Sequence, residues 1–210
     1  MPDATATIND FLDATAAKHP TPGGGAVTAL AGALAAAMGE MVLNYSVGRK
    51  NQPPAADAEL RPALDALHAA RVELLALMAD DQVAYGALTA ARKLPDDVPG
   101  KAEQVAASLA ASIRGPQRMG DAAVALLEAC DRVVDLVNPY LLSDLAVCAD
   151  LAMATVRCAA HNVRVNLPDV GDPAERQRLG DETERTSARG LALVRQVAPR
   201  IWARVERAGG

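Results

Sequence analysis

Hydrophobic residues recur every three or four positions along almost the whole chain, and polar residues occupy the positions between them. This spacing is typical of amphipathic helices, and no segment alternates with the period of two that a strand needs. The predicted helices cover about residues 7–18, 25–47, 57–93, 101–114, 117–137, 143–166 and 174 to the C-terminus. We therefore predict an all-α fold, a bundle of about seven helices that form a single domain over residues 1–210.

Local signals mark several helix ends. Thr7 followed by Asp10 has the spacing of a capping box at the start of a helix. Gly115-Pro116 is expected to stop or kink a helix, because proline has no backbone N–H and clashes with the preceding turn. Asn138-Pro139 is expected to end the next helix for the same reason.

The second predicted helix is strongly apolar. The run over residues 26–43 is long enough to raise the question of a membrane span, but Glu40 and the many alanine and glycine residues favour a central buried helix. Gly25, Gly32 and Gly39 are spaced by seven and lie on one side. Such a row of small residues lets another helix approach closely, either from the same chain or from a partner subunit.

Composition narrows the classes of function. Half of the 210 residues are hydrophobic but only 2% are aromatic, which favours close-packed helices over sheets. A net charge of −5 without a basic patch argues against nucleic acid as a partner. Cys130, Cys148 and Cys158 lack metal or redox spacing, so we interpret them as reduced core thiols of a cytoplasmic protein.

The segment Pro-Thr-Pro-Gly-Gly-Gly-Ala-Val at 20–27 is the most informative part of the sequence. Pro22 cannot continue a helix, and Gly23, Gly24 and Gly25 allow close contacts that a side chain would forbid. The helix that follows offers unpaired N–H groups and a positive dipole end, which suit an anion or a carboxylate. The alternative is that the glycines only allow a tight turn against a neighbouring helix.

Asp81 is the strongest single candidate for chemistry. It shares the apolar stripe of the third predicted helix with Leu77, Tyr85 and Leu88, so it faces the core or a cleft. A carboxylate in that position is costly unless it is paired or poised for proton transfer. Two interpretations remain open: a structural ion pair with a cation, or an acid–base group.

Three blocks of sequence, in order and at the expected spacing, point to a family. They are residues 20–34 running on to Val47-Gly48-Arg49-Lys50; Asp81-Gln82-Val83-Ala84-Tyr85 with Lys93-Leu94-Pro95; and Asn138-Pro139, Ser143-Asp144-Leu145 and Asn162-Val163-Arg164-Val165-Asn166-Leu167. The chain thus resembles the C-terminal domain family of formiminotransferase-cyclodeaminase, which includes methenyltetrahydrofolate cyclohydrolases. It departs from the family at Ala26, where serine is usual, and in a shorter basic run around Lys50.

The resemblance implies roles for particular residues. Asp81 matches the family's catalytic aspartate, and we expect the Gly23-Gly24-Gly25 loop to line the active-site cleft near it. The implied substrate-binding residues are Gly23, Gly24, Gly25, Lys50, Tyr85, Asp144, Asn162, Arg164 and Asn166. Asparagine and aspartate side chains at helical spacing suit the polar edge of a pterin, and basic side chains suit the carboxylates of a folate. The alternative for Arg164 and its basic neighbours is an ordinary solvated surface.

The resemblance also implies a function. Cyclodeamination converts 5-formimino-tetrahydrofolate to 5,10-methenyl-tetrahydrofolate, and cyclohydrolysis opens that product to 10-formyl-tetrahydrofolate. Without a formiminotransferase segment in this sequence, we favour cyclohydrolysis slightly. We expect no metal or other cofactor, no membrane and a homodimer. The alternatives are a non-catalytic helical dimer that acts as a scaffold, favoured if Asp81 is ion-paired away from a cleft, or an enzyme for another amidine or imine.

Overall fold

The structure is a computed structural model that describes residues 6–50 and 52–209. Its helices are α1 (Ile8–Ala16), α2 (Gly24–Asn44), α3 (Pro54–Arg92), α4 (Lys101–Val133), α5 (Leu142–Arg164) and α6 (Pro173–Gly209), with short 3₁₀ turns η1 (Pro139–Leu141) and η2 (Leu167–Asp169). No strand occurs in these described ranges. The all-α prediction is confirmed, whereas the expected count of about seven helices is too high by one.

The difference comes from α4, which runs straight through the predicted break at Gly115-Pro116. A proline inside a helix costs about 3 kcal/mol. Ile113 and Met119, on either side of the break, are only 2% and 0% exposed. Because each fully buried side chain of this size contributes about 1.5–3 kcal/mol, packing on both flanks offsets the cost of the proline.

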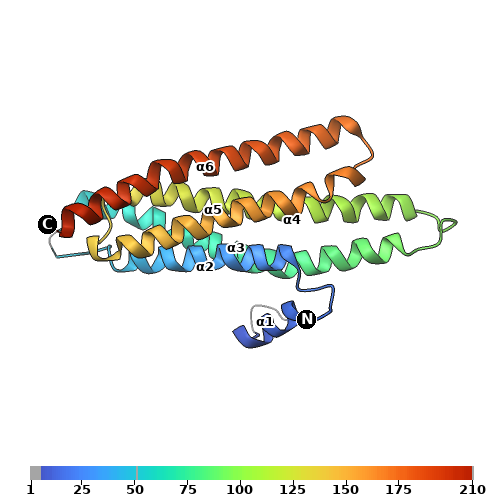
Figure 1. Ribbon diagram of the computed structural model, residues 1–210, viewed down its shortest axis with the longest axis horizontal. Coiled ribbons are helices and arrows are strands. Elements are labelled where there is room, and N and C mark those ends of the chain that lie inside the picture. Colours follow the sequence, from blue (N-terminus) through green and yellow to red (C-terminus); the bar gives the residue numbers. More distant parts are fainter. Residues whose placement is uncertain (1–5, 51, 210) are drawn as a thin grey trace.

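Helices α2 to α5 form an antiparallel four-helix bundle in which each packs against the next and α5 closes the ring against α2 (Figure 1). Helix α6 lies along α4 and α5. The α3–α4 hairpin extends beyond the start of α2, and α1 lies to one side near that start (Figure 1). In α1 the predicted capping box is present, since the Thr7 and Asp10 side chains each bond the other residue's backbone N–H.

The glycine row of α2 faces helices of the same chain. A Cβ on Gly32 would lie 3.0 Å from both Leu74 of α3 and Thr155 of α5, and a Cβ on Gly39 would lie 2.9 Å from Leu67 of α3. The expected close approach of helices is thus confirmed within the chain. It also sets the register: α3 and α5 both run antiparallel to α2, so the end of each lies beside the beginning of α2.

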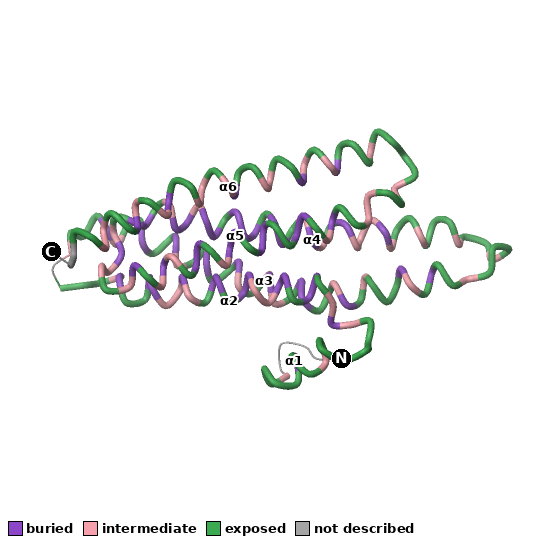
Figure 2. Tube along the Cα trace, viewed as in Figure 1, coloured by how far each residue is buried: buried purple, intermediate pink, exposed green. Residues whose placement is uncertain are grey.

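The core follows the axis of this bundle, where the buried positions gather (Figure 2). Cys130 and Cys148 lie in it with their sulfur atoms 3.5 Å apart, as free thiols. Cys158 is exposed, so its assignment as a core thiol was wrong. Helical periodicity alone did not place Cys158, because it lies at the edge of the buried face of α5.

Helix α2 is long and apolar enough to cross a membrane by length and composition, but 56% of its most apolar window is buried inside the bundle. Its charged residue, Glu40, accepts hydrogen bonds from Arg71, the shorter at 2.6 Å, and lies 3.3 Å from His68. Burial alone would raise the pKa of Glu40, but Arg71 and His68 lower it overall. Glu40 therefore has a structural partner on α3.

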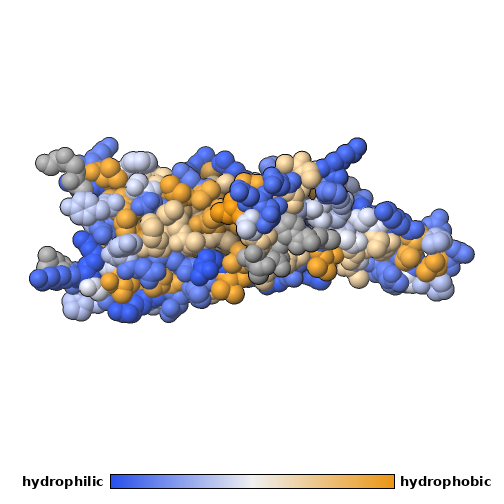
Figure 3. Space-filling view, turned by 90° about the horizontal axis from the view of Figure 1, so that it is seen from below, coloured by the Kyte–Doolittle hydropathy of each residue, from blue (hydrophilic) through white to orange (hydrophobic). Residues whose placement is uncertain are grey.

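The outer side of α2 remains apolar although it faces solvent in the single chain. Val27, Leu34 and Tyr45 are 41%, 55% and 65% exposed. The half-buried Met38 and Met41 lie between them on the same side. Figure 3, which views the molecule from the side where α1 and α2 lie in Figure 1, shows hydrophobic residues gathered over the middle of this face.

Candidate active site

Helix α2 begins in the glycine segment Gly23-Gly24-Gly25, so its N-cap residue has no side chain. Gly23 is the N-cap residue, with extended backbone angles and no side chain of its own to cap the first N–H groups. Pro22 is buried directly before it. The beginning of α2 therefore presents backbone N–H groups and the positive end of the helix dipole to whatever lies in front of it.

Asp81 of α3 lies against this first turn. A Cβ placed on Gly25 would stand 1.9 Å from Oδ1 of Asp81, far inside any permitted contact. Only glycine at position 25 lets the carboxylate reach this place, where it accepts a hydrogen bond from the backbone N–H of Ala26. The predicted proximity of the glycine loop and Asp81 is confirmed.

The surroundings of Asp81 favour its protonated form. Burial raises the pKa of this carboxyl, and the hydrogen bond from Ala26 opposes the rise without cancelling it. No cationic side chain in the described part of the chain forms an ion pair with Asp81. The arrangement fits a carboxyl group that exchanges protons and not a structural ion pair.

Asn162, near the C-terminal end of α5, meets the same turn from the other side. Its Oδ1 would be 3.1 Å from a Cβ on Gly24, and its Nδ2 donates to Thr28 Oγ1 at 3.1 Å and to the Cys158 carbonyl at 2.9 Å. Thr28 in turn donates to the Gly24 carbonyl at 2.6 Å. These bonds fix the amide and leave its carbonyl oxygen directed at the start of α2.

Thr28 is the member of this cluster that sequence reasoning missed. It is 2% exposed and lies one helical turn after Gly24. A threonine four residues into an apolar helix usually bonds back to its own helix, as this one does. Its second role, as acceptor for Asn162, depends on the packing of α5, and the sequence carries no signal for that contact.

Three further predicted residues lie near this end of the bundle. Tyr85 is one turn beyond Asp81 on α3 and is 45% exposed. Asn166 donates to the Asn162 carbonyl at 3.0 Å and so supports the end of α5. Arg164 is exposed and its Nη2 lies 2.6 Å from Glu184 of α6, so it is already ion-paired.

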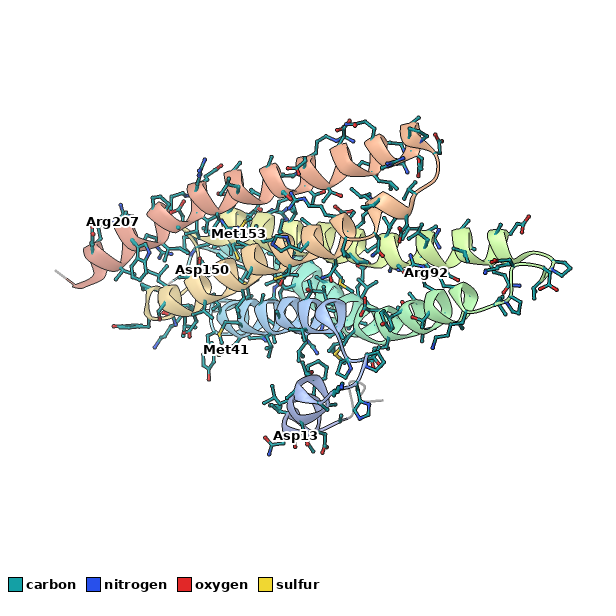
Figure 4. The ribbon with its side chains drawn as sticks, turned by 45° about the vertical axis from the view of Figure 1, so that its right-hand side comes forward. Asp13, Met41, Arg92, Asp150, Met153 and Arg207 are labelled. Atoms are coloured by element: carbon teal, nitrogen blue, oxygen red, sulfur yellow. The ribbon has the colours of Figure 1, made fainter. Side chains whose placement is uncertain are left out.

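Lys50 and Asp144 lie at the other end of the bundle. Lys50 follows the C-terminal end of α2, a helix of 21 residues and therefore about 30 Å long. Asp144 is in the first turn of α5, whereas Asn162 is near its last turn. In Figure 4 the two ends are marked by Arg92, on α3 beyond Asp81, and Arg207, near the end of α6. One chain alone does not bring Lys50 or Asp144 to Asp81.

Two well-defined cavities lie away from Asp81. One of about 340 Å³ lies between α4, α5 and α6 and opens to solvent, and one of about 870 Å³ lies between α4 and the start of α6. Asp81 is instead half-buried against the first turn of α2. Helix α3 continues beyond that turn (Figure 1). That the glycine loop lines a cleft stays a prediction. In the described residues no group of three His, Cys, Asp or Glu side chains is arranged to hold a metal ion.

Comparison with known proteins places this arrangement in a family. The family model described as formiminotransferase-cyclodeaminase matches residues 7–185, which include the glycine junction, Asp81 and Asn162. The chain belongs to the formiminotransferase-cyclodeaminase family. The resemblance inferred from the three sequence blocks is thereby confirmed.

The chain is similar to relatives that are named for two different reactions. It is 32% identical to methenyltetrahydrofolate cyclohydrolase of Methylorubrum extorquens over 95% of this chain and 97% of that protein. It is 30% identical to formimidoyltransferase-cyclodeaminase of Rattus norvegicus over 82% of this chain but only 32% of that protein. A crystal structure of formiminotetrahydrofolate cyclodeaminase from Thermotoga maritima superposes with a TM-score of 0.87 at 26% identity, covering 95% of this chain and 97% of that one.

Proposed function

We propose that this protein is a folate one-carbon enzyme that makes or breaks the bond between the one-carbon unit of tetrahydrofolate and a nitrogen atom. The observation that carries the proposal is Asp81, a half-buried carboxyl that is held against the glycine start of α2, has a raised pKa and has no cationic partner among the described residues. Membership in the formiminotransferase-cyclodeaminase family supports the substrate class.

The proposed chemistry requires only proton transfer. In cyclohydrolysis, water adds to the bridging carbon and forms a tetrahedral centre between two nitrogen atoms while Asp81 takes the proton from the water. Asp81 then returns this proton to the departing nitrogen as the carbon–nitrogen bond breaks, while the hydroxyl oxygen on the carbon loses its own proton to solvent and becomes the formyl carbonyl. A carboxyl group with a raised pKa suits both steps, because a group whose pKa is closer to the working pH both accepts and releases a proton readily. In cyclodeamination the same group can protonate the amine nitrogen, which then leaves the carbon as ammonia. Because both reactions need only proton transfer, we propose that neither uses a metal or a redox cofactor.

The remaining groups would bind and orient the substrate. The backbone N–H groups of Gly24 and Gly25 at the start of α2 and the carbonyl oxygen of Asn162 would offer donors and an acceptor beside Asp81. The polar edge of a pterin carries both kinds of group, so it can satisfy both at once. Tyr85, exposed one turn away, offers a flat surface for an aromatic ring.

Cyclohydrolysis is our first choice between the two reactions. The Methylorubrum extorquens protein of that name matches this chain over nearly the full length of both. Cyclodeamination is the second candidate because the Thermotoga maritima protein of that name has a closely similar fold. Separate incubations with 5,10-methenyl-tetrahydrofolate and 5-formimino-tetrahydrofolate test the choice. Absorbance of the methenyl compound should fall in the first case, whereas in the second it would rise with release of ammonia. No change with either substrate would refute the proposed function.

We further propose that the protein acts as a homodimer joined through α2. A helix that is hydrophobic on all sides is normally buried on all sides, yet Leu34 of α2 and Tyr45, the residue that caps its C-terminal end, are more than half exposed in the single chain. The exposed side extends from Val27 to Tyr45. Two copies that paired antiparallel along it would set residues near Gly48 of one copy opposite Gly24 of the other. Lys50 of each copy would then lie beside the Asp81 site of its partner.

A further inference from the structure

The outer side of α5 carries a repeating pattern that the proposed site does not use. Apolar residues follow one line of this helix in alternating steps of four and three, namely Val147, Leu151, Ala154 and Cys158. Such a line is the seam along which a second helix packs in a coiled coil. Val147, Ala154 and Cys158 are exposed in the single chain, and Leu151 is half-buried. The line is therefore open to a second helix.

Asp150 and Arg157 flank this line. They are seven residues apart on one side of α5, at the positions from which charged residues of a coiled coil reach the partner helix. Both are exposed, and neither forms an ion pair with another described residue. The acid lies in the first half of α5 and the base in the second half. An antiparallel copy of the helix would therefore bring each acid to the base of the other chain.

The packing of α5 on α2 aligns this pattern with the apolar side of α2. That side extends from Val27 to Tyr45, so its middle lies near Ala36. A Cβ on Gly32 would stand 3.0 Å from Thr155, which sets the two helices level at that point. One turn further along α2 is level with one turn earlier on α5, because the helices are antiparallel. The middle of the apolar side of α2 thus lies less than one turn from the midpoint between the acid and the base of α5.

This agreement has a consequence for symmetry. A two-fold axis that crosses both helices at one level pairs α2 with α2 and α5 with α5 at the same time, each antiparallel. Two independent patterns, the apolar side of α2 and the charges beside the seam of α5, place the axis at nearly the same level. A second copy of this chain is therefore the partner that fits the α5 seam.

We propose that two copies pair along α5 as well as along α2, with Asp150 of each chain against the partner's Arg157, and that each copy contributes Asp144 to the Asp81 site of the other. Asp144 and Asn162 lie at equal distances along α5 from its middle, near Met153. They are also about five turns apart, so they are on the same side of the helix. The two-fold axis therefore sets Asp144 of one chain opposite the partner's Asn162.

The part played by Asp144 rests on the proposed function. In one chain Asp144 lies at the end of the bundle opposite Asp81, so only a second copy brings it to the site. There its carboxylate adds an acceptor beside the side-chain carbonyl oxygen of the partner's Asn162. The amino group and the ring N–H at the polar edge of a pterin offer two donors for these two acceptors.

Charge reversal tests the pairing along α5 without any folate. Asp150→Arg and Arg157→Asp each place like charges opposite one another twice in a dimer, so each should raise the dimer Kd in analytical ultracentrifugation about tenfold or more. An equimolar mixture of the two variants should regain the native Kd, because in the mixed dimer every side chain at 150 meets the opposite charge at the partner's position 157. Arg132→Asp, at an exposed position of α4, should leave the Kd unchanged. Circular dichroism checks that each variant folds.

Activity of mixed dimers tests the role of Asp144. Chains with Asp81→Asn and chains with Asp144→Ala are co-expressed, so that in each mixed dimer one site keeps its own Asp81 and receives a native Asp144 from the other chain. The mixed dimer should act on 5,10-methenyl-tetrahydrofolate several times faster than either variant alone. Activity no higher than the average of the two variants would overturn the contribution of Asp144 to its partner.

The two tests fail separately. An unchanged dimer Kd in both charge-reversal variants, or a mixture that dimerises as weakly as its components, would overturn the pairing along α5 whether or not the protein acts on folates. Inactivity of the unmodified protein on folates would instead refute the proposed function, and the charge-reversal result would still decide the interface.

Discussion

Substitution of Gly25 by alanine should displace the catalytic carboxyl more directly than any other single change in the glycine loop. The added Cβ would stand 1.9 Å from Oδ1, 2.3 Å from Cγ and 2.6 Å from Oδ2 of Asp81. An ordinary contact begins near 3.4 Å, so the carboxylate must move by more than about 1 Å. Asp81 is short, and turning it away breaks its hydrogen bond to the N–H of Ala26. Moving α2 instead is resisted by the close packing at Gly32 and Gly39.

These displacements set the expected size of the effect. A misplacement of about 1 Å in a catalytic group costs on the order of 10²-fold in rate. Added volume in a packed region costs about 1–3 kcal/mol of stability. For a chain of this length that corresponds to a fall in Tm of about 2–4 °C for each kcal/mol. We therefore expect Gly25→Ala to lose about 10²-fold in kcat and several degrees in Tm.

The same loop provides matched controls. A Cβ on Gly23 would meet only the Pro20 carbonyl at 3.5 Å, an ordinary contact, and one on Gly24 would meet Asn162 at 3.1 Å, which is tight. Activity measured with 5,10-methenyl-tetrahydrofolate, and Tm measured by circular dichroism, should follow the order Gly23→Ala, Gly24→Ala, Gly25→Ala from mild to severe. Equal activity of Gly25→Ala and Gly23→Ala would refute the reasoning.

A double-mutant cycle separates the clash with Asp81 from other damage to α2. If the carboxylate is the group that the new methyl strikes, Gly25→Ala should cost little stability in a chain that already carries Asp81→Ala. If the loss in Tm is the same with and without the carboxylate, the methyl group strikes something else and the proposed geometry is wrong.

Three further predictions concern Asp81, Thr28 and Leu34. Because burial raises the pKa of Asp81, its ionised form destabilises the fold above that raised pKa; Asp81→Asn should therefore raise Tm at pH 7, and the gain should vanish as the pH falls toward the ordinary value of 3.8, whereas a gain that is independent of pH would contradict this. Thr28→Val removes the acceptor for Asn162 and should lower kcat/KM roughly 2- to 10-fold, the usual value of one hydrogen bond; unchanged kinetics would make the contact irrelevant. Leu34→Glu places a charge in the proposed dimer interface, so light scattering should report a monomer where the unmodified protein is a dimer, and a dimer in both would exclude pairing through this face.

Most of the fold could be predicted because its signals are local. The helical spacing, the capping box at Thr7 and the glycine row of α2 each act within a few residues or along one face. The error at Gly115-Pro116 arose where a local breaker competes with tertiary packing, and buried residues on both sides decided the outcome. The strength of that packing cannot be predicted from the residues next to the proline alone.

The candidate site could be predicted only in part. The contact between Gly25 and Asp81 could be predicted because glycine and an aspartate on an apolar stripe are both unusual where they occur. The hydrogen bond from Asn162 to Thr28 joins residues 134 positions apart, and the sequence of neither helix predicts it. Lys50 was assigned to the site by the family resemblance, although the length of α2 places it at the other end of the chain's bundle. Lys50 would lie beside an Asp81 site only in the proposed dimer, where that site belongs to the partner subunit. Local sequence patterns do not predict how two chains pair.

The most direct test of the central claim is the rate of Asp81→Asn on 5,10-methenyl-tetrahydrofolate. Asparagine keeps the size of the side chain and its acceptor for the Ala26 N–H, but it cannot carry the transferred proton. The account predicts a loss in kcat of about 10²- to 10⁴-fold with substrate binding largely kept, as expected for one positioned acid–base group. Near-full activity of a folded Asp81→Asn protein on both the methenyl and the formimino substrate would contradict the account.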